Sequence, residues 1–456
     1  MQASDTIVAV STPPGRGGIG IIRLSGPQAL ELAGKLLRRP NFEPEPNRVS
    51  LRVLRDPGTG EELERALVTY FQAPRSFTGE DVIEFSCHGS PVLLLQIVDA
   101  LLRLGARAAE PGEFTLRALA NGKLNLSQAE AIRDLIEART TAAARQAARQ
   151  MGGELSARLQ PFKETLLEII VPLESSLEFV EDDLPNVEIE RLSARLSDLI
   201  RMVDELAATF RAGRLLKDGL KATLVGRPNV GKSSIFNALL KQDRAIVTDL
   251  PGTTRDALSE VINLEGIPVL LTDTAGVRES ADAIERIGIE RTRRAISDAD
   301  LLLVVVDGSE PLTAEDQELI SEVAESPHLI VANKCDLGSF SLQRLLQVVT
   351  DGVEVIAVSA RTGQGLEDLR KAVLRSCSAP ENSIEGLLLT NARHYDLLRR
   401  ASDSLKASRK LLEESASEEL VLVGLYDALR YLGQITGETT PEDVLTQIFS
   451  TFCIGK

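Results

Sequence analysis

The sequence predicts a multidomain protein with an α+β amino-terminal domain, an all-α helical bundle and an α/β domain inserted into that bundle. Short β-type runs separated by turns come first, and apolar stripes at three- and four-residue spacing follow them. These helical stripes resume near the carboxyl terminus. Between the two helical parts, the stretch 222–240 reads as strand, glycine-rich loop and helix, as in an open α/β sheet. The predicted boundaries are residues 1–121 for the α+β domain, 122–219 and 377–456 for the helical domain, and 220–376 for the inserted domain.

The amino-terminal domain is expected to be a sheet with one helix. Its β-type runs are residues 6–10, 20–23, 49–53, 66–71 and 81–85. Residues 91–103 are predicted to be helical, because Pro91 stands near the start of this apolar run and Gly105 just past its end. Residues 40–47 are predicted to form a loop, since three prolines leave too few backbone donors for a strand.

The helical domain begins where the pattern changes near Leu124. Ser127-Gln-Ala-Glu130 has a capping-box sequence, and apolar stripes then run from Leu155 to Leu177 and from Ile189 to Phe210. The stripes are read as bundle core, and nothing in them supports a cofactor channel. Helices are expected again at 387–412 and 418–432, with a last one capped by residues 440–443. Helices on both sides of one domain indicate an insertion into the bundle.

Composition limits the classes of function. The chain of 456 residues carries 51 Lys and Arg against 67 Asp and Glu, a net charge of −16, so no global basic field attracts nucleic acid. Any RNA contact must be local or come from a partner. The four cysteines show no paired metal spacing and suit a reducing compartment. Without a basic, apolar amino-terminal signal or an apolar run of roughly 20 residues, a soluble cytoplasmic protein is expected.

The motif that organises the chain is Gly226-Arg-Pro-Asn-Val-Gly-Lys-Ser-Ser234. Glycines let the backbone curl until successive N–H groups point inward, and the following helix presents its positive end to a phosphate chain. Lys232 would reach the β- and γ-phosphates, and the Ser233 hydroxyl would ligate Mg²⁺. Taken alone, the motif also fits a glycine-rich turn that binds nothing.

Three further motifs follow predicted strands and favour a nucleotide site. They are Asp273-Thr-Ala-Gly276, Asn333-Lys-Cys-Asp336 and Ser359-Ala-Arg361. Ligands bind at this edge of an open α/β sheet. The Asp336 carboxylate can accept two hydrogen bonds from guanine N1–H and its exocyclic amine, whereas adenine offers no such pair, so GTP is predicted over ATP.

This set of motifs resembles the small GTP-binding proteins. Pro251-Gly-Thr-Thr-Arg-Asp256 fits the first switch of that family, with Thr254 as a second Mg²⁺ ligand. The inserted domain is therefore predicted to be an α/β P-loop GTPase domain. The predicted GTP-binding residues are Asn229, Val230, Gly231, Lys232, Ser233, Ser234, Thr248, Asp249, Leu250, Pro251, Gly252, Thr253, Thr254, Asp273, Thr274, Ala275, Gly276, Asn333, Lys334, Asp336, Ser359, Ala360 and Arg361.

The carboxyl-terminal Cys453-Ile-Gly-Lys456 has three readings: a prenylation box, a frayed tail, or a mobile thiol and amine delivered to a site elsewhere. Together with Asn229, the 251–256 motif and Asn121-Gly-Lys-Leu-Asn-Leu-Ser-Gln-Ala-Glu130, it makes the whole chain resemble the MnmE (TrmE) tRNA-modification GTPases. The resemblance implies a homodimer that forms a heterotetramer with a flavoprotein partner, and that partner supplies FAD. It implies addition of an aminomethyl-type group to C5 of the wobble uridine in tRNA.

The same resemblance implies an amino-terminal domain that is folate-binding-like and holds a tetrahydrofolate derivative. The residues carried over are Arg23, Glu80, Lys123 and Lys456 for folate, and Cys453 as a catalytic thiol. Glu80 can accept paired hydrogen bonds from a pterin; without the resemblance it reads as a solvated turn carboxylate. Arg23 is expected to end a strand.

Hydrolysis lacks one expected part, because Val277 stands where a Ras-type site has glutamine. The family resemblance implies K⁺ bound by Asn229, Thr248, Leu250 and Thr253 in place of an arginine finger, enclosed when two G domains pair. It also implies that Glu285 is a catalytic residue that organises the attacking water. Lys232 is the other predicted catalytic residue of hydrolysis. Two other classes share such a GTP site: ribosome-assembly GTPases that act as RNA-binding switches, and dynamin-like membrane GTPases.

Overall fold

The computed structural model describes residues 5–178, 186–243, 258–273, 298–346, 353–376, 386–438 and 442–455. The chain divides into two compact units. The first comprises residues 1–133, 150–160 and 429–456, and the second comprises residues 134–149 and 161–428. Each unit is described below by itself.

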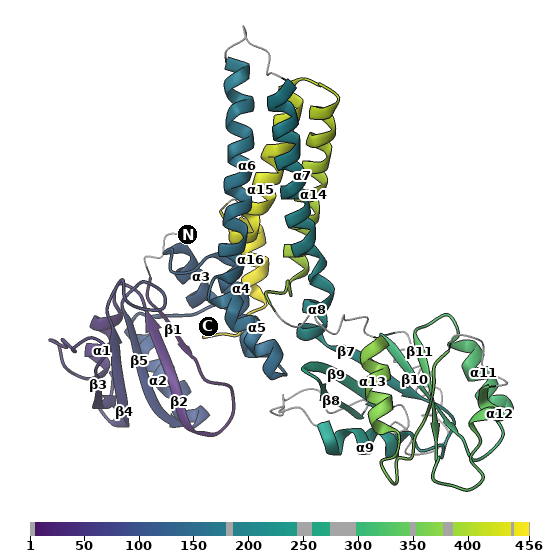
Figure 1. Cartoon of the computed structure of the whole chain (residues 1–456). Helices are drawn as coiled ribbons and strands as arrows, with labels where there is room; N and C mark the ends of the chain where they lie inside the picture. Colours follow the sequence, from purple (N-terminus) through teal and green to yellow (C-terminus); the bar gives the residue numbers. More distant parts are fainter. Residues whose placement is uncertain are drawn as a thin grey trace. The chain divides into compact units, whose positions relative to one another are not determined.

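The first unit contains a six-stranded sheet whose strand order is β3-β4-β5-β2-β1-β6. Its strands are β1 (Ile7–Val10), β2 (Gly17–Ser25), β3 (Val49–Arg55), β4 (Glu62–Phe71), β5 (Val82–Gly89) and β6 (Arg107–Ala108). All pairs are antiparallel except β1 with β6. Helices α1 (Ala29–Leu36) and α2 (Pro91–Leu104) pack one face of this sheet, where Leu32, Ile97 and Leu101 meet Ile22 and Phe85 (Figure 1). The predicted α+β architecture is confirmed.

Most local predictions for this unit hold. The five predicted strands are present, and α2 ends at Gly105, whose φ of 116° is the left-handed cap that glycine favours. Residues 40–47 lie in an irregular connection. The prediction missed α1 and α3 (Glu113–Ala120). Arg23 does not end its strand, because β2 continues to Ser25, which pairs with Val82.

Helix α4 (Leu126–Glu137) begins with a capping box, but not at the predicted residues. The Asn125 side chain accepts from the Gln128 N–H at 3.0 Å, and the Gln128 side chain accepts from the Asn125 N–H at 3.0 Å. Ser127 lies inside the helix, so the box starts two positions earlier than its S-x-x-E spelling suggests. Leu126 and Ala129 of α4 pack against Phe449 of α16 (Glu442–Ser450).

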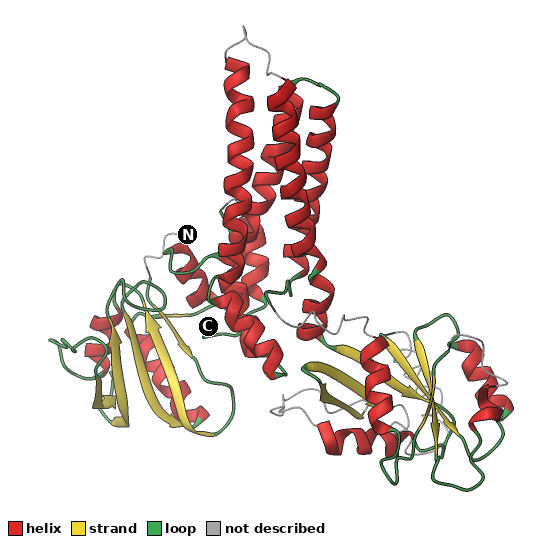
Figure 2. Cartoon of the chain, in the orientation of Figure 1, coloured by secondary structure: helices red, strands yellow, loops and turns green. Residues whose placement is uncertain are grey.

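The second unit contains long helices that run side by side (Figure 2). They are α6 (Glu154–Glu178), α7 (Asn186–Ala208), α14 (Ala392–Glu413) and α15 (Glu418–Thr436), of which residues 154–160 and 429–436 belong to the first unit. The shorter helices are α5 (Thr141–Met151) and α8 (Phe210–Asp218). The apolar stripes are buried along most of their length, as predicted: Leu166, Ile169, Leu199 and Val203 are fully buried, whereas Leu177 at the end of the first stripe is exposed. Polar bonds cross between helices, such as Ser402 Oγ to Asp204 Oδ1 at 2.5 Å, so the stripes form bundle core.

One helix boundary was predicted wrongly. Residues 387–390 are not helical, and α14 begins after Asn391, whose side chain accepts from the Arg393 N–H at 2.9 Å. The preceding residues form other bonds: the Leu389 N–H donates to Thr209 Oγ1, and Leu388 O accepts from Gln146 Nε2. Tertiary contacts thus override the helical pattern. The predicted cap at Thr440 and Pro441 lies outside the described residues.

The inserted α/β domain has a second six-stranded sheet with the order β12-β11-β10-β7-β9-β8. Its strands are β7 (Leu220–Val225), β8 (Leu258–Leu264), β9 (Ile267–Asp273), β10 (Leu301–Asp307), β11 (His328–Asn333) and β12 (Val355–Ala357). All pairs are parallel except β8 with β9. Helices α8, α9 (Lys232–Asp243) and α13 (Leu366–Ser376) pack one face, while α11 (Ala314–Glu322) and α12 (Leu342–Leu346) lie by the other.

The strand order of this sheet reverses at β7. Strands β9 and β8 lie on one side of β7, and the later strands β10, β11 and β12 lie on the other. Such a switch point is where open α/β sheets bind ligands, at the carboxyl ends of the strands. Within the described residues, no helix is both long enough and apolar enough to cross a membrane.

Candidate functional site

The glycine-rich loop between β7 and α9 needs its glycines for both conformation and space. Gly226 has a φ of 151° and Gly231 a φ of 101°, and a Cβ at Gly226 would lie 2.3 Å from Val305 O on β10. Asn229 also adopts a positive φ, 67°, which asparagine tolerates better than most residues. The loop therefore curls tightly against the sheet, as a phosphate cradle requires.

Lys232 places its ammonium inside this curl. Its Nζ donates to the carbonyls of Gly226 at 2.7 Å and of Arg227 at 2.8 Å, and the residue is 6% exposed. Lys232 is also the first residue of α9, whose amino-terminal end carries a partial positive charge. A phosphate at this loop would meet both charges.

Ser233 and Asp273 form the oxygen pair that Mg²⁺ favours. Ser233 Oγ donates to Asp273 Oδ2 at 2.6 Å, and Asp273, at the end of β9, is fully buried. Hydroxyl and carboxylate oxygens are hard ligands, so the donor set fits this cation. The second predicted ligand, Thr254, lies outside the described residues.

Asn333 joins three of the predicted motifs. It ends β11 and is 3% exposed. Its Nδ2 donates to Val230 O in the glycine-rich loop at 2.8 Å, and its Oδ1 accepts from the Ala360 N–H at 3.2 Å. The structure thus brings the phosphate loop, the Asn-Lys-Cys-Asp motif and the Ser-Ala-Arg motif into one site.

Asp336 is exposed at this site, and Ser359 fixes its orientation. Ser359 Oγ donates to Asp336 Oδ1 at 2.7 Å, while the same hydroxyl accepts from the Thr362 N–H at 3.1 Å. Ser359 is fully buried, so its hydroxyl is a rigid support. The carboxylate is presented to solvent, where a base can hydrogen-bond it.

Two carboxylates that pair with basic residues of the site, Asp307 and Asp316, were not predicted from sequence. Lys334, with a φ of 67°, pairs its Nζ with Asp307 Oδ2 at 2.5 Å. Burial alone would raise the pKa of Asp307, but the bonds from Lys334 and Ser309 outweigh it and hold that pKa below its usual range. Arg227 pairs with Asp316 at 3.1 Å. Asp307 could have been suspected, because it too follows a buried parallel strand.

The first unit holds a second polar cluster, around Glu80. Ser25 Oγ donates to Glu80 Oε2 at 2.7 Å, and Arg117 Nη1 lies 3.2 Å from both carboxylate oxygens. The Glu80 side chain is 13% exposed, so it is not a solvated turn carboxylate. Arg117 is a residue that the sequence analysis missed, since nothing local marks it.

The other predicted folate residues lie near this cluster. Arg23 stands two positions before Ser25 on β2, on the same face, and pairs with Glu84 at 2.7 Å. Lys123 donates to Pro74 O at 2.8 Å, and its aliphatic stem would be 3.3 Å from a Cβ at Gly79. Lys123 therefore packs against the loop before β5.

The carboxyl-terminal tail is docked in the same unit through Gly455. The Gly112 N–H donates to Cys453 O at 3.3 Å, and Ile454 forms an antiparallel bridge with Pro111. Gly455 O accepts from Ser11 Oγ at 3.0 Å and from Arg23 Nη1 at 3.4 Å. The frayed-tail reading is therefore wrong for these residues. Cys453 is exposed.

Several predicted residues lie outside the described part of the chain. These are Thr248, Asp249, Leu250, Pro251, Gly252, Thr253, Thr254, Thr274, Ala275, Gly276, Glu285 and Lys456. The first switch, three of the four predicted K⁺ ligands and the predicted water-organising Glu285 thus stay predictions.

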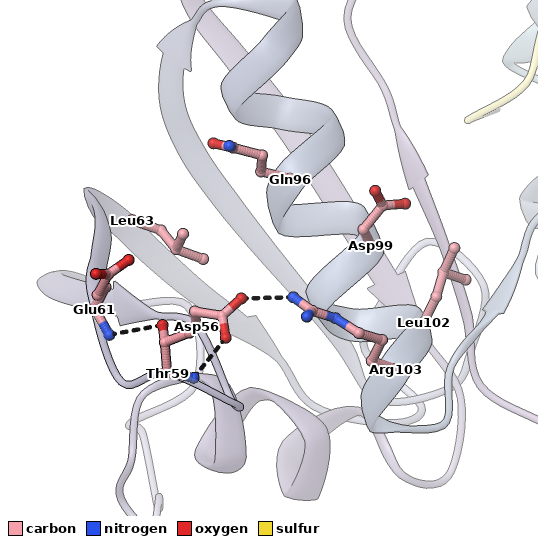
Figure 3. Close-up of a pocket in the computed structure, with 8 residues that line it drawn as sticks. All are labelled: Asp56, Thr59, Glu61, Leu63, Gln96, Asp99, Leu102 and Arg103. Carbon is pink, nitrogen blue, oxygen red and sulfur yellow. Dashed lines mark hydrogen bonds and ion pairs between the residues drawn. The ribbon is translucent and has the colours of Figure 1, made fainter.

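A cavity of about 520 Å³ lies between the β3–β4 turn and α2 in the first unit (Figure 3). Its lining includes Asp56, Glu61, Asp99 and Arg103, and none of the predicted site residues. Arg103 Nη2 pairs with Asp56 Oδ2 at 2.5 Å across its floor. The charges that line this cavity are partly matched to one another.

Comparison with known proteins matches the whole chain. Residues 6–123 match the family model for the GTP-binding protein TrmE N-terminus, and residues 126–453 match the model for the MnmE helical domain. A tRNA modification GTPase MnmE of Koribacter versatilis (strain Ellin345) is 47% identical over 459 residues, with 100% of both chains covered. Proteins of the same name from Aquifex aeolicus (strain VF5) and Heliobacterium modesticaldum (strain ATCC 51547 / Ice1) are 44% and 43% identical. They cover 99% and 100% of this chain, and each is covered over 100% of its own length.

Proposed function

The chain belongs to the MnmE family of tRNA modification GTPases, and from that premise we propose that it hydrolyses GTP to drive modification of the wobble uridine in tRNA. Family membership favours this class over the ribosome-assembly and membrane GTPases that share such a GTP site. The GTP site in this proposal rests on the two hydrogen bonds of Asn333, to Val230 O and from the Ala360 N–H. They bring the glycine-rich loop, the Asn-Lys-Cys-Asp motif and the Ser-Ala-Arg motif together.

In the proposed site, Lys232 and the amino-terminal end of α9 hold the β- and γ-phosphates. Ser233, with Thr254, would hold Mg²⁺, which neutralises charge on the phosphoryl oxygens when bound. The Asp336 carboxylate accepts from guanine N1–H and the exocyclic amine, and Ser359 keeps it in position. Lys334 is steadied by Asp307 beside the base site.

We assign the missing charge of the hydrolytic site to K⁺, with Asn229 as its ligand from the phosphate loop and Thr248, Leu250 and Thr253 as the others. Asn229 supports this because it is exposed in the phosphate loop, three residues before Lys232, where an ion can reach its amide oxygen. Glu285 would orient the attacking water through a second water. Pairing of two G domains would exclude bulk water from this ion.

The first unit is proposed to bind a tetrahydrofolate derivative. Glu80 would accept the paired donors of the pterin, while Arg23 and Lys123, with Lys456, would orient or neutralise the rest of the molecule. The docked tail places Cys453 two residues from Gly455, whose carbonyl accepts from Arg23, which supports a role for its thiol. The folate supplies the carbon of the aminomethyl-type group when bound.

The proposed assembly is a homodimer that works with a FAD-containing flavoprotein on tRNA in the cytoplasm, as a heterotetramer. The net charge of −16 supports a division of labour in which the partner supplies much of the basic surface for tRNA. Movement of paired G domains would be transmitted through the helices on which they are inserted.

The first test is GTP turnover by the full-length protein in K⁺ and in Na⁺ at equal ionic strength. We expect strong stimulation by K⁺ in the wild type and its loss in Asn229→Ala and in Asn229→Gly. The glycine variant is the matched control for backbone strain, because glycine adopts a φ of 67° freely. Equal rates in both salts would overturn the assignment of K⁺, and a variant effect confined to alanine would assign it to the backbone.

A further inference from the structure

We propose that Arg117 is the positioning residue that presents the Glu80 carboxylate to the pterin. This inference rests on the folate-binding function proposed above and names the residue that makes that site selective. Arg117 lies on α3, 37 positions away in sequence from Glu80, and is 5% exposed.

The first reason is geometric. Glu80 stands in an irregular connection before β5, where the backbone alone does not fix a side chain. Arg117 Nη1 lies 3.2 Å from both of its oxygens, and Ser25 Oγ lies 2.7 Å from one of them. Ser25 is fully buried, so the carboxylate is held from two sides by rigid groups. Its 13% exposed edge is what a pterin can reach.

The second reason is the distribution of charge. Arg117 Nη2 also pairs with Asp5 at 2.7 Å and with Glu113 at 2.9 Å. Those two carboxylates have a second guanidinium, Arg107, at 2.6 and 2.5 Å. Among the described side chains, Glu80 is paired with Arg117 and not with Arg107. Loss of Arg117 would therefore leave Asp5 and Glu113 with one shared cationic partner, Arg107, but would leave Glu80 held only by the Ser25 hydroxyl among the described side chains.

The two arginines offer a matched comparison. Both hold the same pair of carboxylates, but the Arg117 side chain is 5% exposed and that of Arg107 is 43% exposed, so loss of Arg117 should lower the stability of the unit more. They also differ in their contact to Glu80. A role confined to folding predicts that each folded variant recognises the pterin as the wild type does, whereas a positioning role predicts that recognition changes only when Arg117 is lost.

The experiment is calorimetric binding of 5-formyltetrahydrofolate and of its 2-desamino analogue to the full-length protein, with urea unfolding of each variant. The wild type should prefer the parent compound about 10- to 100-fold, since the analogue leaves the charged acceptor with one partner fewer. Arg117→Met should lose at least about tenfold in affinity for the parent, and its preference should fall close to one. Arg107→Met should keep the preference despite reduced stability.

Arg117→Lys keeps the charge but cannot contact Glu80, Asp5 and Glu113 together. We expect it to recover stability while recovering the preference only in part. Full preference in folded Arg117→Met overturns the proposal, and so does full preference in Arg117→Lys should the methionine variant not fold. A wild type that binds neither compound would instead refute the proposed folate function.

Discussion

The substitution Gly455→Ala is predicted to release the carboxyl-terminal tail from its dock. Gly455 has a φ of 94°, and a Cβ at this position would lie 2.4 Å from Val10 O and 3.0 Å from Ser11 Cα. Both obstacles are backbone atoms of β1 and the residue after it, so neither can rotate away. An alanine at 455 can be accommodated only if the tail shifts.

The size of the effect follows from two contributions. A left-handed conformation costs an L-residue about 1–2 kcal/mol relative to glycine. Shifting the tail also breaks the bond from Ser11 Oγ to Gly455 O, and such a bond contributes about 0.5–1.5 kcal/mol. Together they shift the equilibrium toward the undocked tail by roughly ten- to several-hundredfold.

The assay is amide hydrogen exchange at Gly112, whose N–H donates to Cys453 O at 3.3 Å. Mass spectrometry of a peptide spanning residues 109–114 reports it. The matched control is Gly105→Ala, which has the same left-handed requirement with a φ of 116° but no atom within 4 Å of its Cβ. Exchange at Gly112 should accelerate in Gly455→Ala and not in Gly105→Ala. Unchanged exchange in Gly455→Ala would refute the steric reasoning.

Two further predictions concern the GTP site. Asn333→Ala should lower GTP affinity, measured by calorimetry, about 10- to 100-fold, because it leaves the Val230 carbonyl and the Ala360 N–H without their partner. Affinity equal to that of the wild type would show that these two hydrogen bonds do not organise the GTP site. The pKa of Asp307 is lowered in the folded state, so its pairing with Lys334 stabilises the fold above the usual carboxyl pKa and is lost as pH falls through the lower folded pKa. The stability difference between wild type and Asp307→Asn should accordingly be full near pH 7 and shrink below about pH 4; a constant difference in urea unfolding would exclude this linkage.

Local signals in the sequence predicted the helices and strands whose limits are set by residues within the element or next to it. Pro91 and Gly105 mark the ends of α2, and the apolar runs before the glycine-rich loop and before Asn333 are the buried strands β7 and β11. These predictions succeed because the determining residues lie within one turn or one strand of the element. The predicted nucleotide residues that the structure describes meet for the same reason, as strands of a parallel sheet end at one edge.

Signals failed where polar groups outside the recognised pattern decide the outcome. Residues 387–390 have a helical pattern, yet Thr209 and Gln146 engage their backbone groups. Ser127 has the spelling of a cap, yet Asn125 and Gln128 form it. The bonds to Thr209 and Gln146 are not visible in a window of one helix. Asn125 and Gln128 do lie in the same window as Ser127, and there two possible capping pairs compete.

The two candidate sites share one construction. In each, a loop that carries ligand-binding groups is held by a polar side chain from the end of a neighbouring element. Asn333 holds the glycine-rich loop through Val230 O, and Asn121 holds the loop before β5 through Thr78 O at 2.7 Å. A carbonyl can be fixed this way by a residue far away in sequence, so the motif marks Asn333 as a site residue but does not name its partner. Loops fixed before a ligand arrives lose little entropy on binding, so changes to these anchors should affect ligand affinity more than the stability of the sheets beneath them.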